Sequence, residues 1–455
     1  MPTRSVPAFL AIMGLLAGGC GGEPPPNLLL IVVDTLRADH LGAYGHGRRT
    51  SPELDAFARD AVRFERAYAT APWTQPSVAS ILTGLAPATH GADRLLRVLP
   101  DSAVTLAERL RDAGYATGAV VSHTLLGPRF GFDQGFETFV HGDALGPGRF
   151  STPGVTERGT QLLEAFAREQ RPFFVMLHYF DPHYSYERHP DVGFAAAGGA
   201  GRLTGEESIE TLLALDPPPA PEEVDFVRSL YDEEVHFTDA GIGRLLRAVD
   251  RLGIDERTVV VVSADHGEEF WERGALGHAH TLHEELVRVP LMIRGPGLEP
   301  RVVDEPVSLL ALAPTLLDLL EVPADGFQAR SFAQRARTGT GPLPEPIYLE
   351  TEYFEPGESP DRASRKHGVI EGNLKLVEDR ITGERRLYDL AADPDERDPL
   401  PDTRPALEAQ LERLAERYAS QRLEGAPSPI APTPAERRML EALGYVAGAP
   451  SNDAP

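Results

Sequence analysis

The sequence predicts an α/β fold in which a mainly parallel central sheet carries helices on both faces. Continuous apolar runs, of the length typical of strands buried on both sides, occur at 28–33, 173–177 and 258–263. Segments with helical periodicity separate these runs, and that alternation is typical of parallel strands joined by helical crossovers. With 455 residues the chain can hold one large α/β domain and a smaller one.

The remaining elements follow from periodicity and from start and stop signals. Helical spacing predicts helices at 52–61, 104–113, 156–169, 222–252 and 309–320. Shorter apolar runs predict two more strands, at 117–122 and 290–293. The segment 193–220 is rich in Gly, Ala and Pro, which predicts a long surface loop. Short strand-like runs between 345 and 390 suit a small antiparallel appendage.

The N-terminal residues have the features of a targeting segment. Arg4 precedes an apolar run that is too short to span a bilayer and that ends in Leu16-Ala17-Gly18-Gly19-Cys20. This pattern resembles a bacterial lipoprotein signal peptide, so we expect a lipid on Cys20 and a location at the cell envelope. A plain secretory peptide is the alternative. Cys20 is the single cysteine, so no disulfide can form within the sequence.

Composition then divides the chain into five parts. These are the signal peptide at 1–20, a tether at 21–26, a main domain at 27–340, a small subdomain at 341–400, and a helical and Pro-rich tail at 401–455. The charge is unbalanced, with 69 acidic against 44 basic side chains and a formal net charge of −25. Such a field repels polyanions, so we expect no nucleic-acid partner. An anionic substrate would need a locally positive site, such as a bound metal ion.

Six side chains able to bind ligands follow the expected strand ends. They are Asp34, His123, Asp181, His183, Asp265 and His266. Ligand sites in sheets of this class lie beyond the carboxyl ends of the strands. The sequence therefore predicts a site at that edge of the sheet.

The stretch from Ala71 to Gly84 adds a hydroxyl to this site. Pro76 suits the first turn of a helix, which places Thr74 at or just before the helix start. A helix N-terminus favours bound oxyanions, and a hydroxyl there becomes a nucleophile when a metal ion lowers its pKa. For Thr74 considered alone, an ordinary helix cap is the alternative.

Four of these residues form a plausible set of metal ligands. Asp34, Thr74, Asp265 and His266 offer three oxygen donors and one imidazole, which a divalent Ca, Mg, Mn or Zn ion accepts. An Asp-His pair alone is more often a turn with a surface histidine. The hypothesis therefore depends on the four residues together.

Several motifs, in order along residues 27–400, resemble those of the sulfatase family within the alkaline phosphatase-like superfamily. They are Asn27–Asp34, Pro76–Gly84, Asp181–His183, Ser263–Glu268, Val289–Ile293 and Leu387–Pro394. The resemblance implies an alkaline phosphatase-like three-layer α/β/α sandwich with a mainly parallel central sheet and a small C-terminal antiparallel α+β subdomain. It also implies that residues 27–340 form the catalytic domain.

The same resemblance implies roles for individual residues. Asp34, Asp265 and His266 would hold the metal and Thr74 would be the nucleophile, while His183 would contact the ester oxyanion or act as a general acid. His280 falls where the family usually carries a lysine that touches the sulfate, so it could donate a hydrogen bond or bind a second ion. Three further residues could support the ligands or bind a second metal: Asp181, His123 and His278. We expect one ion rather than two, and a packing role for His278.

The chain departs from the family pattern at the nucleophile. The family converts a Cys or Ser to formylglycine within Cys/Ser-x-Pro-x-Arg, whereas this chain has Thr74 and Val78, so we expect no formylglycine. The usual Asp-Asp pair is Asp34-Thr35, which lacks one carboxylate. A covalent ester on threonine must be attacked by water or by an acceptor alcohol, and phosphoryl intermediates suit this route well.

The expected function is metal-dependent hydrolysis of sulfuric or phosphoric esters through a metal-bound Thr74 at the cell envelope. The substrate would be an anionic ester linked to a glycan or a lipid. One alternative is a phosphodiesterase, or a phosphoglycerol- or phosphoethanolamine-type transferase, acting on envelope lipid or glycan. A binding protein that kept the fold and lost the chemistry is a third hypothesis.

Overall fold

The computed structural model describes residues 24–142, 151–169, 171–342, 344–353, 364–401, 404–425 and 429–442. The predicted signal peptide with Cys20, and the first half of the predicted tether, lie outside these residues. Of the helices in the described part, none combines the length and the apolar character needed to cross a bilayer.

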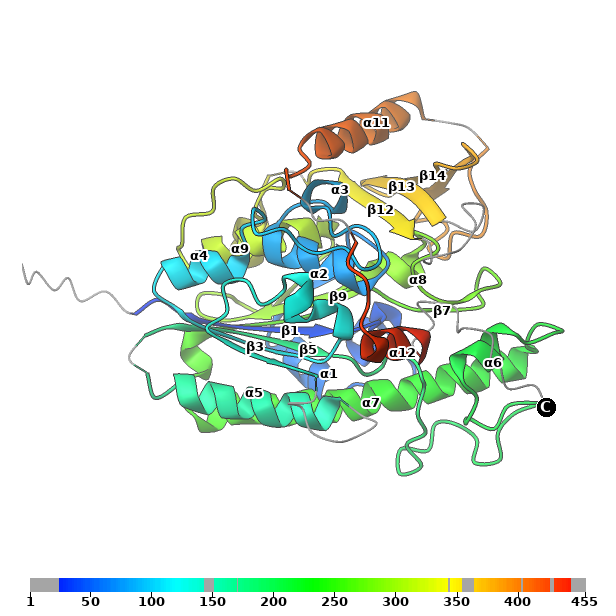
Figure 1. Cartoon of the computed structure of the whole chain (residues 1–455), viewed down its shortest axis with the longest axis horizontal. Helices are drawn as coiled ribbons and strands as arrows, with labels where there is room; N and C mark the ends of the chain where they lie inside the picture. Colours follow the sequence, from blue (N-terminus) through cyan, green and yellow to red (C-terminus); the bar gives the residue numbers. More distant parts are fainter. Residues whose placement is uncertain are drawn as a thin grey trace, which may run out of the picture.

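A nine-stranded sheet forms the middle layer of the molecule (Figure 1). Its centre is β1 (Asn27–Val33), which pairs in parallel with β5 (Phe173–Tyr179) and with β6 (Thr258–Ala264). Every residue of these three strands is buried, which explains their continuous apolar runs. Only β9 (Arg288–Arg294), among the described strands of this sheet, is antiparallel to its neighbours. The predicted mainly parallel sheet is confirmed.

The outer strands extend the sheet on both sides. The full order is β10-β2-β9-β6-β1-β5-β3-β4, and β11 pairs with β2. These strands are β2 (Val62–Tyr68), β3 (Ala116–Val121), β4 (Thr138–His141), β10 (Arg301–Val303) and β11 (Val307–Ser308).

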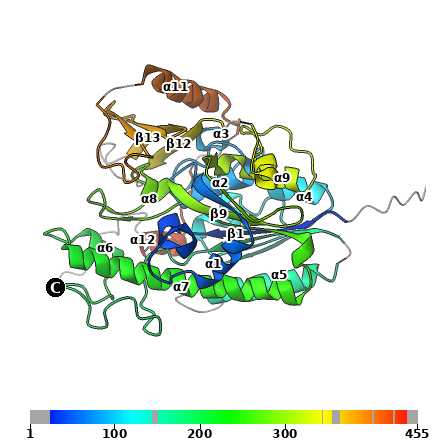
Figure 2. The same cartoon turned by 180° about the vertical axis from the view of Figure 1, so that it is seen from behind.

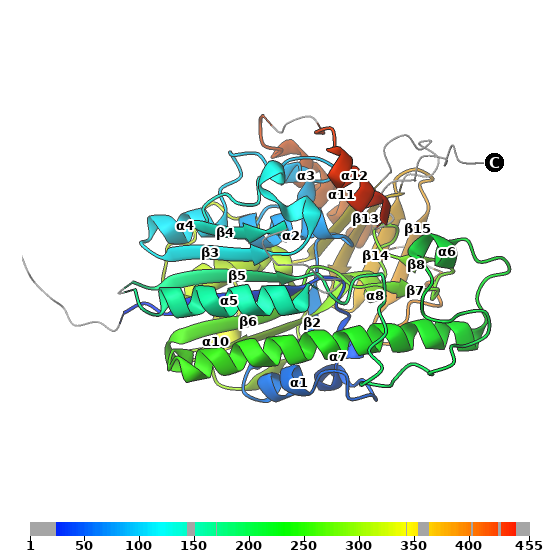
Figure 3. The same ribbon diagram turned by 60° about the horizontal axis from the view of Figure 1, so that its bottom comes forward.

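Helices cover both faces of the sheet, as Figures 1 and 2 show from opposite sides. One layer contains α1 (Pro52–Arg59), α5 (Thr152–Phe166) and α7 (Pro221–Arg251). The long α7 runs across the whole layer (Figure 3). The other layer contains α2 (Thr74–Thr83), α4 (Leu106–Asp112) and α9 (Leu312–Leu319). The predicted three-layer α/β/α sandwich is confirmed.

A separate four-stranded antiparallel sheet lies at one end of the molecule (Figure 1). Its strands are β12 (Ile347–Tyr353), β13 (Ser364–Glu371), β14 (Leu374–Asp379) and β15 (Arg385–Asp389). Leu411 and Leu414 of α11 (Pro405–Ser420) share an apolar cluster with one face of this sheet. Leu349 and Ile370 on the opposite face share another with the region around α8 (Glu284–Val287). The small sheet is therefore packed between α11 and the larger domain.

The other described helices and strands are short. They are α3 (Pro87–His90), α6 (Ile209–Leu213), α10 (Ala333–Thr338), α12 (Pro434–Ala442), β7 (Glu269–Phe270) and β8 (Leu276–Gly277).

Two differences between the structure and the predicted elements bear on the site or on the domain organisation. Helix α5 begins at Thr152 rather than 156, because the Asp181 carboxylate accepts hydrogen bonds from the backbone N–H groups of Ser151 and Thr152. The predicted loop at 193–220 contains α6, whose N-cap Ser208 accepts from Thr211 N. The described part of the tail, predicted to be helical and Pro-rich, contains α11 and α12.

Candidate active site

The carboxyl ends of the three central strands bring together a buried group of polar side chains. Asp34 directly follows β1 and Asp265 directly follows β6, whose last residues, Val33 and Ala264, are paired in the strand register. On the other side of β1, Val32 is paired with His178 of β5. We call Asp34, Thr74, His178, Asp265 and His266 the strand-end cluster; none of the five exposes surface to solvent.

The members of the strand-end cluster are separated by distances that suit a shared cation. His266 Nε2 lies 3.4 Å from Asp34 Oδ1, 3.8 Å from Asp265 Oδ2 and 3.3 Å from Thr74 Oγ1. His178 Nε2 lies 3.6 Å from Asp265 Oδ2 and 3.9 Å from Asp34 Oδ2. One ligand atom from each of Asp34, His178 and Asp265 falls within 4.8 Å of the other two.

The hydrogen bonding of this cluster is incomplete. No residue in the described part of the chain makes a hydrogen bond to either oxygen of Asp34, to Asp265 Oδ2 or to either ring nitrogen of His178. Burying a carboxylate without a partner costs several kcal/mol as an order of magnitude. Unpartnered carboxylate oxygens beside imidazole nitrogens are a donor set that divalent cations accept. The residues present therefore fit a divalent metal ion.

The pKa shifts of the cluster also indicate that it suits a bound cation. Burial, together with the nearby Asp265, raises the pKa of Asp34. Burial also opposes ionisation of Asp265, but His266 and His178 together outweigh burial and lower the pKa of Asp265. Burial disfavours a charged His266, yet Asp265 and Asp34 raise the pKa of His266 to about 9. Without a cation, the two carboxylates thus draw positive charge onto the imidazole.

Helix α2 presents Thr74 to the cluster. The helix begins at Thr74, after Trp73 in extended backbone at the N-cap position, so Thr74 is the first helical residue. Ser77, one turn later, donates a hydrogen bond of 2.6 Å to the backbone carbonyl of Asp265 and ties the helix start to the loop after β6. The N-terminal end of α2, with its partial positive charge, therefore faces the strand-end cluster.

Three other histidines surround the cluster. The ring of His278 lies 4.6 Å from that of His266 and 5.0 Å from that of His183, between ring centroids. The His123 ring lies 6.3 Å from that of His178 and 6.1 Å from that of His183. Burial lowers the pKa of His183 to about 4 and the pKa of His123 and His278 well below the usual value, so all three are neutral at pH 7.

The structure does not bring His280 and Asp181 into the cluster. His280 Nε2 lies 2.7 Å from Glu269 Oε2, and its Nδ1 lies 2.9 Å from the carbonyl oxygen of His278. Both oxygens of Asp181 accept backbone hydrogen bonds at the start of α5, with lengths of 3.3 Å and 2.8 Å. His278, for which the sequence predicted a packing role, lies instead with its ring 4.6 Å from that of His266.

His178 is not among the ligands predicted from the sequence. Its signal was a single histidine, next to last in a strand that is otherwise apolar or aromatic. Such a residue is ambiguous until strand pairing shows that its side chain lies beside two buried carboxylates. The buried carboxylates of α7 were also missed, among them Glu233, which accepts hydrogen bonds from His189 N and Ala195 N, each 2.8 Å long.

Comparison with known proteins places this geometry in context. Residues 26–322 match the family model described as Sulfatase. The chain is 28% identical over 341 residues to the ulvan-active sulfatase of Formosa agariphila, a match covering 68% of this chain and 64% of that protein. It is also 28% identical over 424 residues to arylsulfatase A of Homo sapiens, covering 79% of this chain and 76% of that protein.

Among solved structures, the fold is similar to that of the phosphonate monoester hydrolase of Agrobacterium radiobacter. The TM-score is 0.69 at 20% sequence identity, and the match covers 90% of this chain and 100% of that one. At this level of identity the likeness concerns the fold alone.

Proposed function

Because the chain belongs to the sulfatase family, we propose that it hydrolyses sulfuric or phosphoric esters with Thr74 as the nucleophile. The enzyme class that the relatives indicate is sulfuric ester hydrolase. The observation that carries the proposal for Thr74 is the position of its hydroxyl, which lies 3.3 Å from His266 Nε2 inside the strand-end cluster.

The strand-end cluster would hold one divalent cation through Asp34, Asp265, His266, His178 and the Thr74 hydroxyl. When bound, such a cation lowers the pKa of a coordinated hydroxyl and stabilises negative charge on an ester. The chain has Thr35 where the family usually carries a second carboxylate ligand. His178 would take the place of that missing ligand. A neutral imidazole would supply the missing donor without adding negative charge.

The chemistry at Thr74 has two stages. The Thr74 oxygen attacks the sulfur or phosphorus atom, the bond to the substrate alcohol breaks, and the alcohol leaves with a proton. Water then attacks the ester on Thr74 and regenerates the hydroxyl. Threonine cannot form the hydrated aldehyde of formylglycine, so the second stage needs this attack. His183, neutral at pH 7, carries one ring proton and one acceptor nitrogen, which suits proton exchange with the leaving alcohol and water.

We also propose that the substrate is an anionic ester borne by a glycan or lipid at the bacterial cell envelope. The N-terminal pattern ending at Cys20, which would anchor the protein by a lipid, supports this location. A phosphodiesterase, or a phosphoglycerol- or phosphoethanolamine-type transferase, is the second candidate. It is favoured by Thr74 itself, since a phosphothreonine can pass its group to an acceptor alcohol as well as to water.

The test is activity on a panel of nitrophenyl sulfate, phosphate and phosphodiester in the presence of Mg, Ca, Mn or Zn. Replacing Thr74 by Ala should lower kcat by roughly 10³-fold or more, as removal of a catalytic nucleophile does. Thr74→Ser, which keeps the hydroxyl, is the matched control and should retain activity. Intact mass after brief exposure to substrate should show a sulfo or phospho adduct on the wild type.

Full turnover by Thr74→Ala would refute the nucleophile assignment. Product formation that depends on an added acceptor alcohol would favour the transferase. If the protein binds metal but hydrolyses no ester in the panel, the result would favour the third hypothesis, a binding protein that has lost catalysis.

A further inference from the structure

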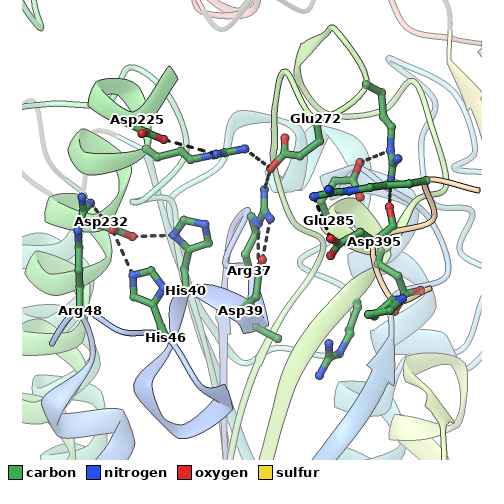
Figure 4. Close-up of a pocket in the computed structure, with 17 residues that line it drawn as sticks. Arg37, Asp39, His40, His46, Arg48, Asp225, Asp232, Glu272, Glu285 and Asp395 are labelled. Carbon is green, nitrogen blue, oxygen red and sulfur yellow. Dashed lines mark hydrogen bonds and ion pairs between the residues drawn. The ribbon is translucent and has the colours of Figure 1, made fainter. Parts of the chain in front are cut away.

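A second group of metal-ligating side chains lines a cavity of about 760 Å³, to which no member of the strand-end cluster contributes (Figure 4). The group consists of His40, His46 and Asp232, and we call it the His40 cluster. His40 and His46 follow β1 in a segment of short 3-10 turns, whereas Asp232 lies in α7. In Figure 4 both imidazoles point toward the Asp232 carboxylate from the same side of the cavity.

The geometry of the His40 cluster is tight. His40 Nδ1 lies 2.6 Å from Asp232 Oδ1, and His46 Nε2 lies 3.2 Å from Asp232 Oδ2. The three ligand atoms all fall within 4.8 Å of one another. Ligands held about 2.0–2.2 Å from a tetrahedral zinc ion stand roughly 3.4 Å apart. The 2.6 Å and 3.2 Å separations are shorter than this, and the two imidazole rings are stacked with centroids 4.9 Å apart, so the side chains must move apart and turn for zinc to bind.

We propose that His40, His46 and Asp232 form a second metal site that binds Zn²⁺. Two imidazoles and one carboxylate are a donor set that zinc accepts, with water from the cavity as the fourth ligand. The set differs from the oxygen-rich strand-end cluster, which also accepts the harder Mg²⁺ and Ca²⁺. The two sites therefore have different metal preferences.

Arg48 occupies one side of the Asp232 carboxylate and competes with the cation. Its Nη1 lies 2.8 Å from Asp232 Oδ2 and 2.8 Å from Ser229 Oγ. The Arg48 side chain is 43% exposed, whereas that of Asp232 is 1% exposed. An exposed arginine can swing into solvent when zinc binds, while the buried carboxylate stays in place.

The site would fasten the segment after β1 to α7. Tyr231, next to Asp232 in α7, donates a hydrogen bond of 2.7 Å to the carbonyl of Thr35 and accepts one of 2.9 Å from Arg37 N. Thr35 directly follows Asp34 and has a positive φ of 53°. Tyr231 already holds the turn after Asp34 against α7. Zinc bound at the His40 cluster would add a second attachment between the same two segments.

The experiment separates the two sites by metal and by variant. Zinc binding to metal-stripped protein is measured by competition with a chromophoric chelator, in an Asp265→Asn background that removes a strand-end ligand. We expect one zinc equivalent to remain. Adding His46→Ala should weaken it by at least the roughly 100-fold that loss of a supporting partner can cost. Adding Arg48→Ala instead should tighten zinc binding, because the competing cation is gone.

Two further measurements keep the result interpretable. Circular dichroism and thermal unfolding show whether His46→Ala is folded, and Asp232→Asn provides a second variant that keeps the side-chain shape. Cobalt in place of zinc should give the visible absorption of a tetrahedral site, and this absorption should be lost in both variants. Equal zinc affinity with and without His46, or no zinc bound in the Asp265→Asn background, would overturn the proposal. Neither result would bear on ester hydrolysis at Thr74.

Discussion

The strand-end cluster and the ion pairs around Lys375 both bring two carboxylates together in a largely buried setting, and they differ in what neutralises the negative charge. The Lys375 side chain is fully buried, and its Nζ lies 3.0 Å from Glu284 Oε1 and 3.0 Å from Glu396 Oε1. Glu396 Oε2 also accepts a hydrogen bond of 2.7 Å from Glu284 N. Asp34 and Asp265 have no lysine or arginine partner within the described part of the chain, only the imidazoles of His178 and His266 at 3.4–3.9 Å.

The carboxylates paired with Lys375 serve the fold, whereas the strand-end carboxylates serve the proposed activity. Lys375 lies on β14 and Glu284 on α8, so their pairing ties the small sheet to the larger domain. In the strand-end cluster, both oxygens of Asp34 and one oxygen of Asp265 accept no hydrogen bond from the described residues. Burying these two carboxylates therefore lowers the stability of the fold. Proteins retain such costs where activity requires them. The unpartnered oxygens of Asp34 and Asp265 therefore mark the strand-end cluster as functional.

The largest effect should follow from breaking the paired region. Replacing Lys375 by Met leaves the buried Glu396 and the partly buried Glu284 without their cation, so the free energy of unfolding should fall by about 3–5 kcal/mol. Urea denaturation followed by circular dichroism measures the change. The control is Lys366→Met in the same sheet, where a partly exposed pair with Asp379 at 3.3 Å should contribute less than about 1 kcal/mol. An equal loss of unfolding free energy in both variants would show that burial does not increase the contribution of the Lys375 ion pairs to stability.

Supplying the missing cation should stabilise the strand-end cluster. Mg²⁺ or Ca²⁺ at about 100 times its dissociation constant should raise the free energy of unfolding by about 2.7 kcal/mol, because only the native state holds the ligands together. The gain is read as a shift of the thermal midpoint against the metal-stripped protein. Asp265→Asn should abolish it and His46→Ala should retain it. A gain that survives Asp265→Asn would place the cation elsewhere.

Glu350 shows a third way to bury a carboxylate, which is to keep it protonated. Burial raises the pKa of Glu350 to about 8, and Tyr348 Oη donates to it at 3.0 Å. The native state then holds a proton that the unfolded chain releases near pH 4.5, so stability falls as pH rises from about 4.5 to 8. The slope should approach about 1.4 kcal/mol per pH unit. Urea denaturation at several pH values should show this slope in the wild type and a smaller one in Glu350→Gln.

The smallest effect should come from removing a strand-end charge without metal. In the presence of a chelator, Asp34→Asn should raise the free energy of unfolding by about 1 kcal/mol, because it relieves the repulsion between Asp34 and Asp265. The same variant should lose the stabilisation by Mg²⁺. A destabilised Asp34→Asn protein in chelator would show that the carboxylate serves the fold after all.

Much of the fold followed from local patterns in the sequence. Fully buried parallel strands must be apolar along their whole length, so the runs at 28–33, 173–177 and 258–263 could be identified without a structure. The carboxyl ends of such strands share one edge, so Asp34 and Asp265 could be predicted to meet. Pro76 marked the helix start that presents Thr74.

Other features depended on contacts that no local pattern records. His178 becomes a candidate ligand only when β5 pairs with β1, and Asp181 becomes the cap of α5 through contacts 29 and 30 residues away in the chain. His278 and His280 are two residues apart in one loop, yet only His278 packs against His266.

Strand and helix periodicities reflect which faces are buried, so the layers of the fold and the strand ends at which the site forms could be predicted from the amino-acid order. Which polar groups find a partner depends on the folded chain. Hydrogen bonds and ion pairs act over a few ångströms, and most of those that matter here join residues far apart in the chain. Assembly of the sheet buries Asp34 and Asp265 with oxygens that have no hydrogen-bond partner among the described residues. Packing of α7 brings Asp232 into contact with His40 and His46.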